Sequence, residues 1–175
     1  MTLDELNAAE RGLVSRIRNI SGLIEEKIVR LEENGIFEDY RKVYEAYADL
    51  IEPNAEGLEA LKRSIFLLWF EEAEPPFLSG LDRLSENVSR KIFSDLEHYA
   101  ESKNLDFEME WMLPHYYAIA EWVFDVKNKC SPILRTLLTD NHKLWRKELK
   151  SENFIDRGRM GTYWASLSQS KAVFT

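Results

Sequence analysis

Three carboxylates, Glu71, Glu72 and Glu74, follow a strongly apolar stretch and stand directly before two prolines. The pattern predicts that they lie at the C-terminal end of a helix, because proline ends a helix and restricts the residue before it. That end carries a partial negative charge, which disfavours each carboxylate by about 0.3–1 kcal/mol. A partner that offsets this cost is therefore expected, and we take Glu71 and Glu74 as candidate binding residues.

A second group of candidate residues lies near the C-terminus, where two arginines flank a glycine and two large aromatic residues follow. These residues are Arg157, Arg159, Tyr163 and Trp164. Arginine pairs well with carboxylates, so we expect the arginines to fold back on Glu71 or Glu74 and the aromatic pair to dock on the domain. Two alternatives remain: the carboxylates face solvent, or they bind a cation or a basic partner.

A histidine stands in an aromatic stripe along one face of a further predicted helix. The stripe contains Trp111, His115, Ile119 and Trp122, at spacings of four, four and three residues. A histidine in such a stripe is most often a hydrogen-bonded core residue, although the residue type also suits ligand binding or proton transfer. In that second interpretation, His115 joins Glu71 and Glu74 in a small-molecule-binding or metal-assisted enzyme. Trp69 and Trp122 would roof the pocket.

The motifs of common enzyme classes are absent from the sequence. There is no glycine-rich phosphate loop, His-Glu-x-x-His pair, Gly-x-Ser-x-Gly turn or cysteine cluster. The nearest approach to a metal motif is Asp95 and His98, three residues apart and present once. The sequence therefore predicts no catalytic residue, no metal site and no cofactor.

Charge and composition limit the classes of partner. The net charge of −8 argues against general nucleic-acid binding, which needs a basic surface. The single Cys130 cannot form a disulfide within the chain, and the first 20 residues contain no continuous apolar stretch. No apolar run approaches the roughly 20 residues needed to cross a bilayer. We therefore expect a cytoplasmic protein that does not span a membrane.

Composition and periodicity predict an all-α fold. Hydrophobic residues make up 45% of the chain, and seven glycines and five prolines are too few for a fold rich in tight turns. We expect a single helical domain over residues 1–175, a bundle of six to seven helices whose last residues, about 166–175, fray. The central helix runs to about Ala73 and is apolar on every side, so the others should enclose it.

An apolar stripe from Leu3 to Leu31 predicts a long amphipathic N-terminal helix over residues 3–33. At 1.5 Å per residue it spans roughly 45 Å, so it either bends near Gly22 or projects and pairs with a second copy. Further helices are expected over residues 38–50, 85–102, 106–124 (kinked or split at Pro114), from 131 and over 141–150. Asn54, Ser85 and Ser131 are the expected capping residues.

Two segments resemble the signatures of a group of small bacterial helical proteins of unknown function. The first is Leu61 to Gly80, with Phe66, Trp69, Glu74-Pro75 and Ser79-Gly80, and the second is Arg157-Gly-x-Met160-Gly-x-Tyr163-Trp164. The resemblance implies a bacterial cytoplasmic protein and assigns no activity.

The leading functional hypothesis is a non-enzymatic protein–protein interaction module. One form is an immunity or antitoxin-like inhibitor that covers a basic partner with its acidic residues, Glu25, Glu26, Glu32, Glu33 and the acids near Glu71. The alternatives are the enzyme described above and a self-associating structural protein that forms a homodimer through its N-terminal helix.

Overall fold

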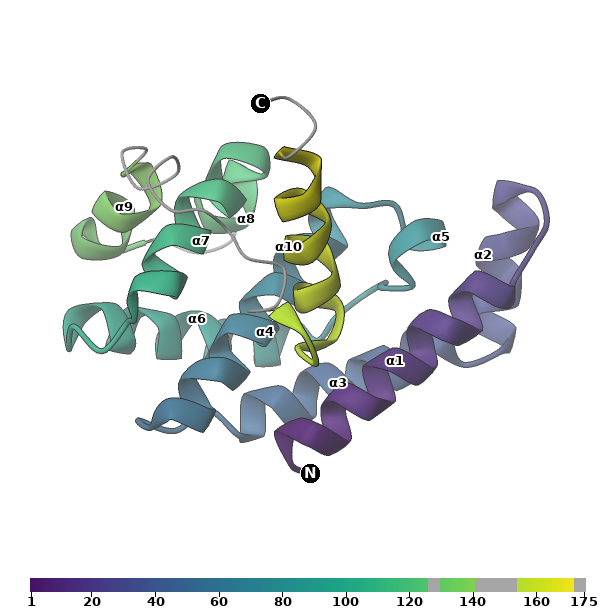
Figure 1. Ribbon diagram of the computed structural model, residues 1–175, viewed down its shortest axis with the longest axis horizontal. Helices are drawn as coiled ribbons and strands as arrows, with labels where there is room; N and C mark the ends of the chain where they lie inside the picture. Colours follow the sequence, from purple (N-terminus) through teal and green to yellow (C-terminus); the bar gives the residue numbers. More distant parts are fainter. Residues whose placement is uncertain (126–129, 141–153, 172–175) are drawn as a thin grey trace.

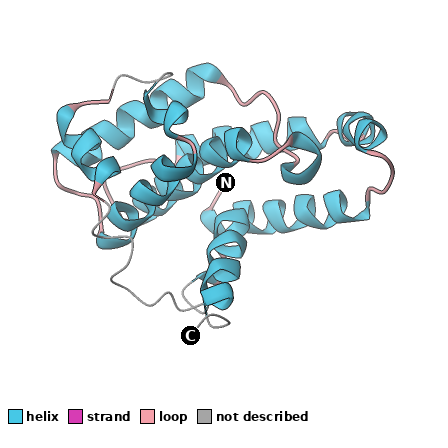
Figure 2. Ribbon diagram, turned by 90° about the horizontal axis from the view of Figure 1, so that it is seen from above, coloured by secondary structure: helices cyan, strands magenta, loops and turns pink. Residues whose placement is uncertain are grey.

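The computed structural model describes residues 1–125, 130–140 and 154–171, and within these ranges the chain is all-α, as predicted (Figure 1, Figure 2). The described ranges contain ten helices. They are α1 (Leu3–Asn19), α2 (Ile24–Glu33), α3 (Ile36–Asp49), α4 (Ala55–Ala73), α5 (Pro76–Ser79), α6 (Glu86–Glu101), α7 (Phe107–Ile119), α8 (Glu121–Asp125), α9 (Pro132–Thr139) and α10 (Gly158–Lys171).

The central helix is α4. Asn54 caps it, because its side-chain oxygen accepts a hydrogen bond from the Gly57 N–H at 2.8 Å. Every residue from Ala60 to Phe70 is buried, and α3, α6, α7 and α10 all contact the helix. Figure 1 shows α10 lying close to α4, with α3 and α1 below it. The prediction of a helix without a solvent face is confirmed.

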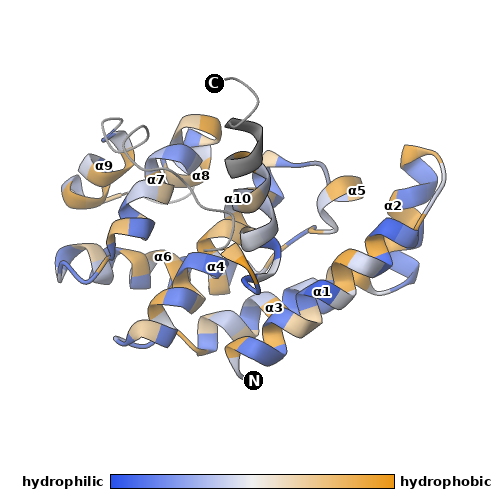
Figure 3. Ribbon diagram, in the orientation of Figure 1, coloured by the Kyte–Doolittle hydropathy of each residue, from blue (hydrophilic) through white to orange (hydrophobic). Residues whose placement is uncertain are grey.

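The N-terminal region consists of two helices where the apolar stripe predicts one. α1 ends at Asn19 and α2 begins at Ile24, because Gly22 adopts a φ of +132° that other residues rarely reach. The prediction of one helix over residues 3–33 was therefore wrong, and of its two alternatives the change of direction near Gly22 is the one observed, as a full break between two helices. The chain reverses at this break, so most of the stripe is covered by α3, while Leu23 and Ile24 stay exposed at the outer end of α2 (Figure 3).

Two further elements, α5 and α8, raise the helix count above six to seven. α5 occupies a segment expected to be a loop, since Pro76 can start a helix as readily as it ends one. α7 continues through Pro114, and the break before α8 falls at Ala120 instead. The packing of buried neighbours such as Leu113 and Tyr116 outweighs the hydrogen bond that the proline removes.

The C-terminal part of the described chain is also more helical than predicted. α10 begins at Gly158, in the segment expected to be irregular, and extends to Lys171, so residues 166–171 of the expected frayed tail are helical. The helix expected over residues 141–150 lies outside the described residues. Within the described ranges, every helix is too short or too polar to traverse a lipid bilayer.

Candidate functional site

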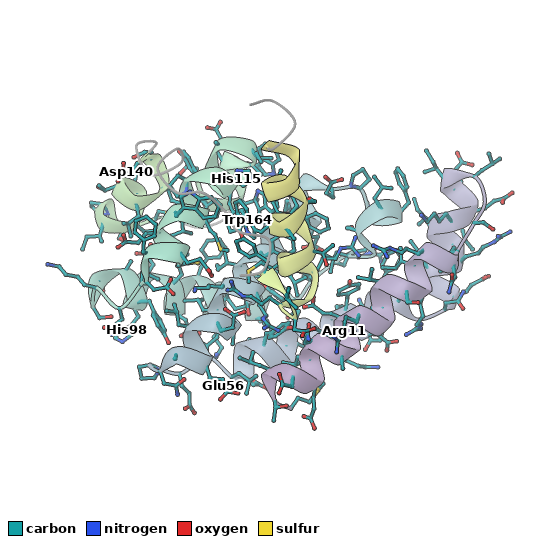
Figure 4. The ribbon with its side chains drawn as sticks, viewed as in Figure 1. Arg11, Glu56, His98, His115, Asp140 and Trp164 are labelled. Atoms are coloured by element: carbon teal, nitrogen blue, oxygen red, sulfur yellow. The ribbon has the colours of Figure 1, made fainter. Side chains whose placement is uncertain are left out.

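The aromatic pair of α10 docks as predicted, in a cluster of rings between α4, α7 and α10. Trp164 is buried, and its Nε1 donates to the Tyr116 hydroxyl at 3.0 Å. The Tyr163 hydroxyl lies 2.7 Å from Nε2 of His115, whose ring centroid is 4.6 Å from that of Trp164 (Figure 4). Tyr163 also packs on Phe66 of α4 at 5.6 Å. The two segments that carry the resemblance therefore lie against each other.

The His115–Tyr163 pair is better suited to holding helices together than to proton transfer. Burial raises the pKa of Tyr163 to about 12, and the negative charge of Glu74 adds to the shift. The hydroxyl consequently keeps its proton at neutral pH, far from the pKa that acid–base catalysis favours. The contact therefore acts as a hydrogen bond between α7 and α10, near Glu74.

The residues expected to form an enzyme pocket are divided between two places. Trp69 lies beside His115, with ring centroids 6.1 Å apart, whereas Trp122 is 43% exposed on α8. Glu74 is electrostatically close to the His115–Tyr163 pair, but Glu71 lines a separate surface together with Leu84. His115 and Glu71 thus face different surroundings at the C-terminal end of α4.

Arg159 returns to the end of α4 as predicted, but through other contacts than an ion pair with Glu71 or Glu74. Its guanidinium lies 5.2 Å from the ring centroid of Phe70 and donates to the Leu78 carbonyl at 2.9 Å. A cation held over an aromatic face and bonded to a carbonyl satisfies the arginine without a carboxylate.

Arg157 pairs with carboxylates that the sequence analysis did not single out. It donates to Glu59 of α4 at 2.9 Å and to Glu108 of α7 at 2.9 Å. Since Glu59 and Glu71 are twelve residues apart on one helix, roughly 18 Å separate them along its axis. The expectation that Arg157 pairs with Glu71 or Glu74 was therefore wrong.

The ion pairs of Arg157 belong to a network of buried and half-buried charges. Lys62 Nζ lies 2.6 Å from Asp106 and 2.9 Å from Glu108, and Arg63 Nε lies 2.8 Å from Glu59. Burial opposes the ionisation of Glu108, but Arg157 and Lys62 outweigh it and lower the pKa of this carboxyl below its ordinary value of 4.5. The network stays charged at neutral pH and joins α4, α7 and the start of α10.

A further buried carboxylate, Glu10 of α1, reaches the start of α10 from the other side. It accepts a hydrogen bond from the Arg159 backbone N–H, and Asn7 accepts one from the Gly158 N–H at 2.8 Å. Burial raises the pKa of Glu10, although the Arg159 N–H and the neighbouring Tyr47 oppose the shift. α1 thereby holds a segment that lies about 150 residues further along the chain.

Three hollows lie near the C-terminal end of α4 and share lining residues, and we refer to them together as the acidic groove. The outer hollow, of about 130 Å³, lies between α2, α3 and residues 82–83. The middle hollow, of about 500 Å³, lies beside the C-terminal end of α4. The inner hollow, of about 260 Å³, lies between α4, α6 and α8. Asp82 and Arg83 line both the outer and the middle hollow, and Glu71, Leu84 and Glu86 line both the middle and the inner one.

The groove carries more negative than positive charge. Its carboxylates are Glu32, Glu38, Glu71, Glu72, Asp82 and Glu86, and its cations are Arg41, Arg83 and Arg90. Each arginine lies near an acid of the groove, at 2.8 Å from Glu38, 2.8 Å from Asp82 and 3.9 Å from Glu86 respectively. These exposed pairs are weak, and three carboxylates remain in excess.

Glu71 has a fixed orientation in this groove. Its Oε1 accepts a hydrogen bond from the Leu84 N–H at 2.8 Å. Burial raises the pKa of Tyr44, and the charge of Glu71 adds to the shift, which places the carboxylate close to the Tyr44–Ser89 hydrogen bond of 3.0 Å. Of the acids proposed from the sequence to meet a basic partner, Glu32, Glu71 and Glu72 line hollows of the acidic groove.

The structural carboxylates Glu59 and Glu108 do not stand at the C-terminal end of a predicted helix, which is the signal that marks Glu71 and Glu74. Lys62 and Arg63 stand just before the apolar run from Ile65 to Phe70, in the helix predicted to be buried on every side. Buried cations need carboxylate partners, so these two residues predict acids such as Glu59 and Glu108 nearby. That signal was present in the sequence.

The chain is thus an all-helical protein with an acidic groove at one end of its central helix. Comparison with protein-family models, with curated proteins and with solved structures found no match. Among the described residues, no three His, Cys, Asp or Glu side chains are grouped so that they could hold a metal ion. Interpretation of the groove therefore rests on its shape and charge.

Proposed function

We propose that this protein is a non-enzymatic interaction module whose acidic groove binds a basic segment of another protein. The observation that carries the proposal is that the three hollows share lining residues: Asp82 and Arg83 link the hollow of Glu32 to the one that Glu71 and Glu86 line. Acids far apart in the sequence thus form one electrostatic target. Such complementarity speeds association and selects partners of opposite charge.

One concrete form of this function is an immunity or antitoxin-like inhibitor in the bacterial cytoplasm. A partner with a basic surface would be covered by the groove and by the neighbouring acids of α2, Glu25, Glu26 and Glu33. The helical scaffold supports this role, because the groove walls come from α2, α3, α4 and α6, which pack on one core. A surface formed by helices that share one core loses little conformational entropy when it binds, which favours association.

The test compares two double variants of equal net charge by fluorescence anisotropy with labelled octa-arginine. Glu32→Lys/Glu86→Lys changes the groove, whereas Glu45→Lys/Glu101→Lys changes exposed residues elsewhere on α3 and α6. We expect the groove variant to bind about ten-fold more weakly than the control variant, a difference of 1.4 kcal/mol. Equal losses in both variants would mean that octa-arginine responds to overall charge, and the proposal would fail.

A further inference from the structure

The inner hollow of the acidic groove has an apolar floor beneath its charged rim. Leu68, Leu84, Phe93 and Val123 line it, and each is buried, with exposed fractions between 1% and 7%. The volume of about 260 Å³ is below the roughly 300–1,000 Å³ of pockets that hold drug-sized ligands. The hollow therefore has the size for one inserted side chain.

The rim of the same hollow carries two carboxylates in different settings. Glu71 is half-buried and is oriented by the Leu84 N–H, while the side chain of Glu86 is 92% exposed. The Ser89 hydroxyl, bonded to Tyr44, lies on the same wall. A side chain that enters the hollow thus meets apolar carbon below and negative charge at the edge.

We propose that this inner hollow binds an arginine side chain of the basic partner, an inference that rests on the proposed function. The methylene stem of arginine covers apolar surface while its charged end stays at the rim. The stem packs against Phe93 on the floor, and the planar guanidinium at the rim donates to the Glu71 carboxylate. Lysine fits less well, because its compact ammonium is strongly hydrated and cannot bind a carboxylate through two parallel hydrogen bonds.

The protein's own Arg90 supports the choice of ligand. Its Nη2 lies 3.9 Å from Glu86 and donates to Asn87 at 2.7 Å, at the edge of the hollow. A guanidinium is therefore compatible with this rim. Arg90 also places a like charge beside the proposed ligand, so its removal should strengthen binding of a cationic side chain.

The test is a titration of the full chain with N-acetyl-arginine methylamide, followed by NMR at the Leu84 amide and the Leu68 and Val123 methyl groups. Lysine and norleucine analogues serve as matched probes. We expect saturable shifts with the arginine probe at these signals, at least about five-fold tighter than with the lysine probe, roughly 1 kcal/mol. Equal affinity for arginine and lysine, or shifts confined to other signals, would overturn the proposal.

Three variants sharpen the result. Glu71→Gln keeps an oxygen for the Leu84 N–H but removes the charge, and it should weaken the arginine probe about ten-fold, or 1.4 kcal/mol. Arg90→Gln should tighten it, and Glu45→Gln should leave it unchanged. If Glu71→Gln alters the amide spectrum outside the hollow, Glu86→Gln replaces it, because that side chain is too exposed to affect folding.

The outcomes separate this inference from the proposed function. In one outcome, octa-arginine still distinguishes the two double variants, but the arginine probe does not shift the Leu84, Leu68 and Val123 signals. That result would support the groove as a binding surface and reject the inner hollow as an arginine site. Loss of both responses would reject both proposals.

Discussion

The two halves of α4 use the same residue types for different purposes. In the N-terminal half, Glu59 lies between Arg63 and Arg157, and the side chains of these two cations are 6% and 13% exposed. In the C-terminal half, Glu71 lines two hollows whose arginines, Arg83 and Arg90, are 75% and 68% exposed. Glu59 thus has buried cations beside it, whereas the arginines near Glu71 remain largely in water.

The difference follows from the cost of desolvation. A charge taken out of water costs several kcal/mol unless an opposite charge and hydrogen bonds replace the solvent. In the N-terminal half, Lys62, Arg63 and Arg157 provide the opposite charges, so removal of one of these cations should lower stability. The groove keeps most of its charges in water, so its charges are changeable with little effect on the fold.

The strongest test of this contrast is Arg157→Ala. The substitution leaves Glu59 and Glu108 facing each other with fewer cations, and we expect a loss of about 3 kcal/mol in the free energy of unfolding. Urea denaturation followed by circular dichroism measures the loss. The matched control is Arg90→Ala in the groove, which should change stability by no more than about 0.5 kcal/mol. Similar losses for both arginines would contradict the contrast.

The substitution Gly158→Ala tests the packing of the start of α10 against Glu10 of α1. Gly158 has a φ of +57°, and an added Cβ would meet Glu10 Oε2 at 2.2 Å. We expect a loss of about 2 kcal/mol, from backbone strain together with displacement of the Glu10 carboxylate. Gly12→Ala is the control: it lies inside α1 with nothing within 4 Å of the added carbon, so it should stabilise by about 0.5–1 kcal/mol.

The pH dependence of stability should have opposite signs at two buried carboxylates. Glu10 has a raised pKa in the folded state, so its ionisation destabilises the fold as pH rises above 4.5. Glu108 has a lowered pKa, so it stabilises the fold above 4.5 and loses this effect as pH falls through its folded pKa. Relative to wild type, Glu10→Gln should therefore gain stability with rising pH and Glu108→Gln should lose it. Urea unfolding between pH 3 and pH 8 measures both differences, and slopes of the same sign would refute the assignment.

The smallest expected effect belongs to the groove. Glu32→Lys/Glu86→Lys reverses two exposed charges, and the free energy of unfolding should stay within about 0.5 kcal/mol of wild type. Thermal unfolding checks this value. A loss near that of Arg157→Ala would show that the groove acids hold the fold together, and the distinction between the two halves of α4 would disappear.

Local patterns predicted most of the helices. The all-round apolar sequence of α4 and its Asn54 cap are confirmed, as is the Ser131 cap of α9, whose Oγ accepts from the Leu134 N–H at 3.2 Å. Ser85 does stand before α6, but its side chain makes no capping hydrogen bond. The unexpected helices, α5 and α10, begin at a proline and a glycine. Either residue can stand at the start or just past the end of a helix, and tertiary packing determines which occurs.

The candidate site was less predictable because its parts are distant in the sequence. The docking of Tyr163 and Trp164 followed from their size and apolar character. The ion pairs of Arg157 could not be predicted in this way, because Glu59 and Glu108 lie 98 and 49 residues away and no local spacing relates them to the arginine. The acidic groove likewise depends on the return of residues 80–85 past the end of α4, which is a property of the tertiary structure.

The bridge between Glu59 and Glu108 also bears on the order in which the chain is assembled. Arg157 is synthesised about 50 residues after Glu108, and the Gly158–Asn7 hydrogen bond joins residues 151 apart. Contacts of such long range slow folding, because the chain between them must be ordered first. On the ribosome, Glu59 and Glu108 therefore emerge before the guanidinium that bridges them. The packing of α10 on α1, α4 and α7 must follow the synthesis of all three helices.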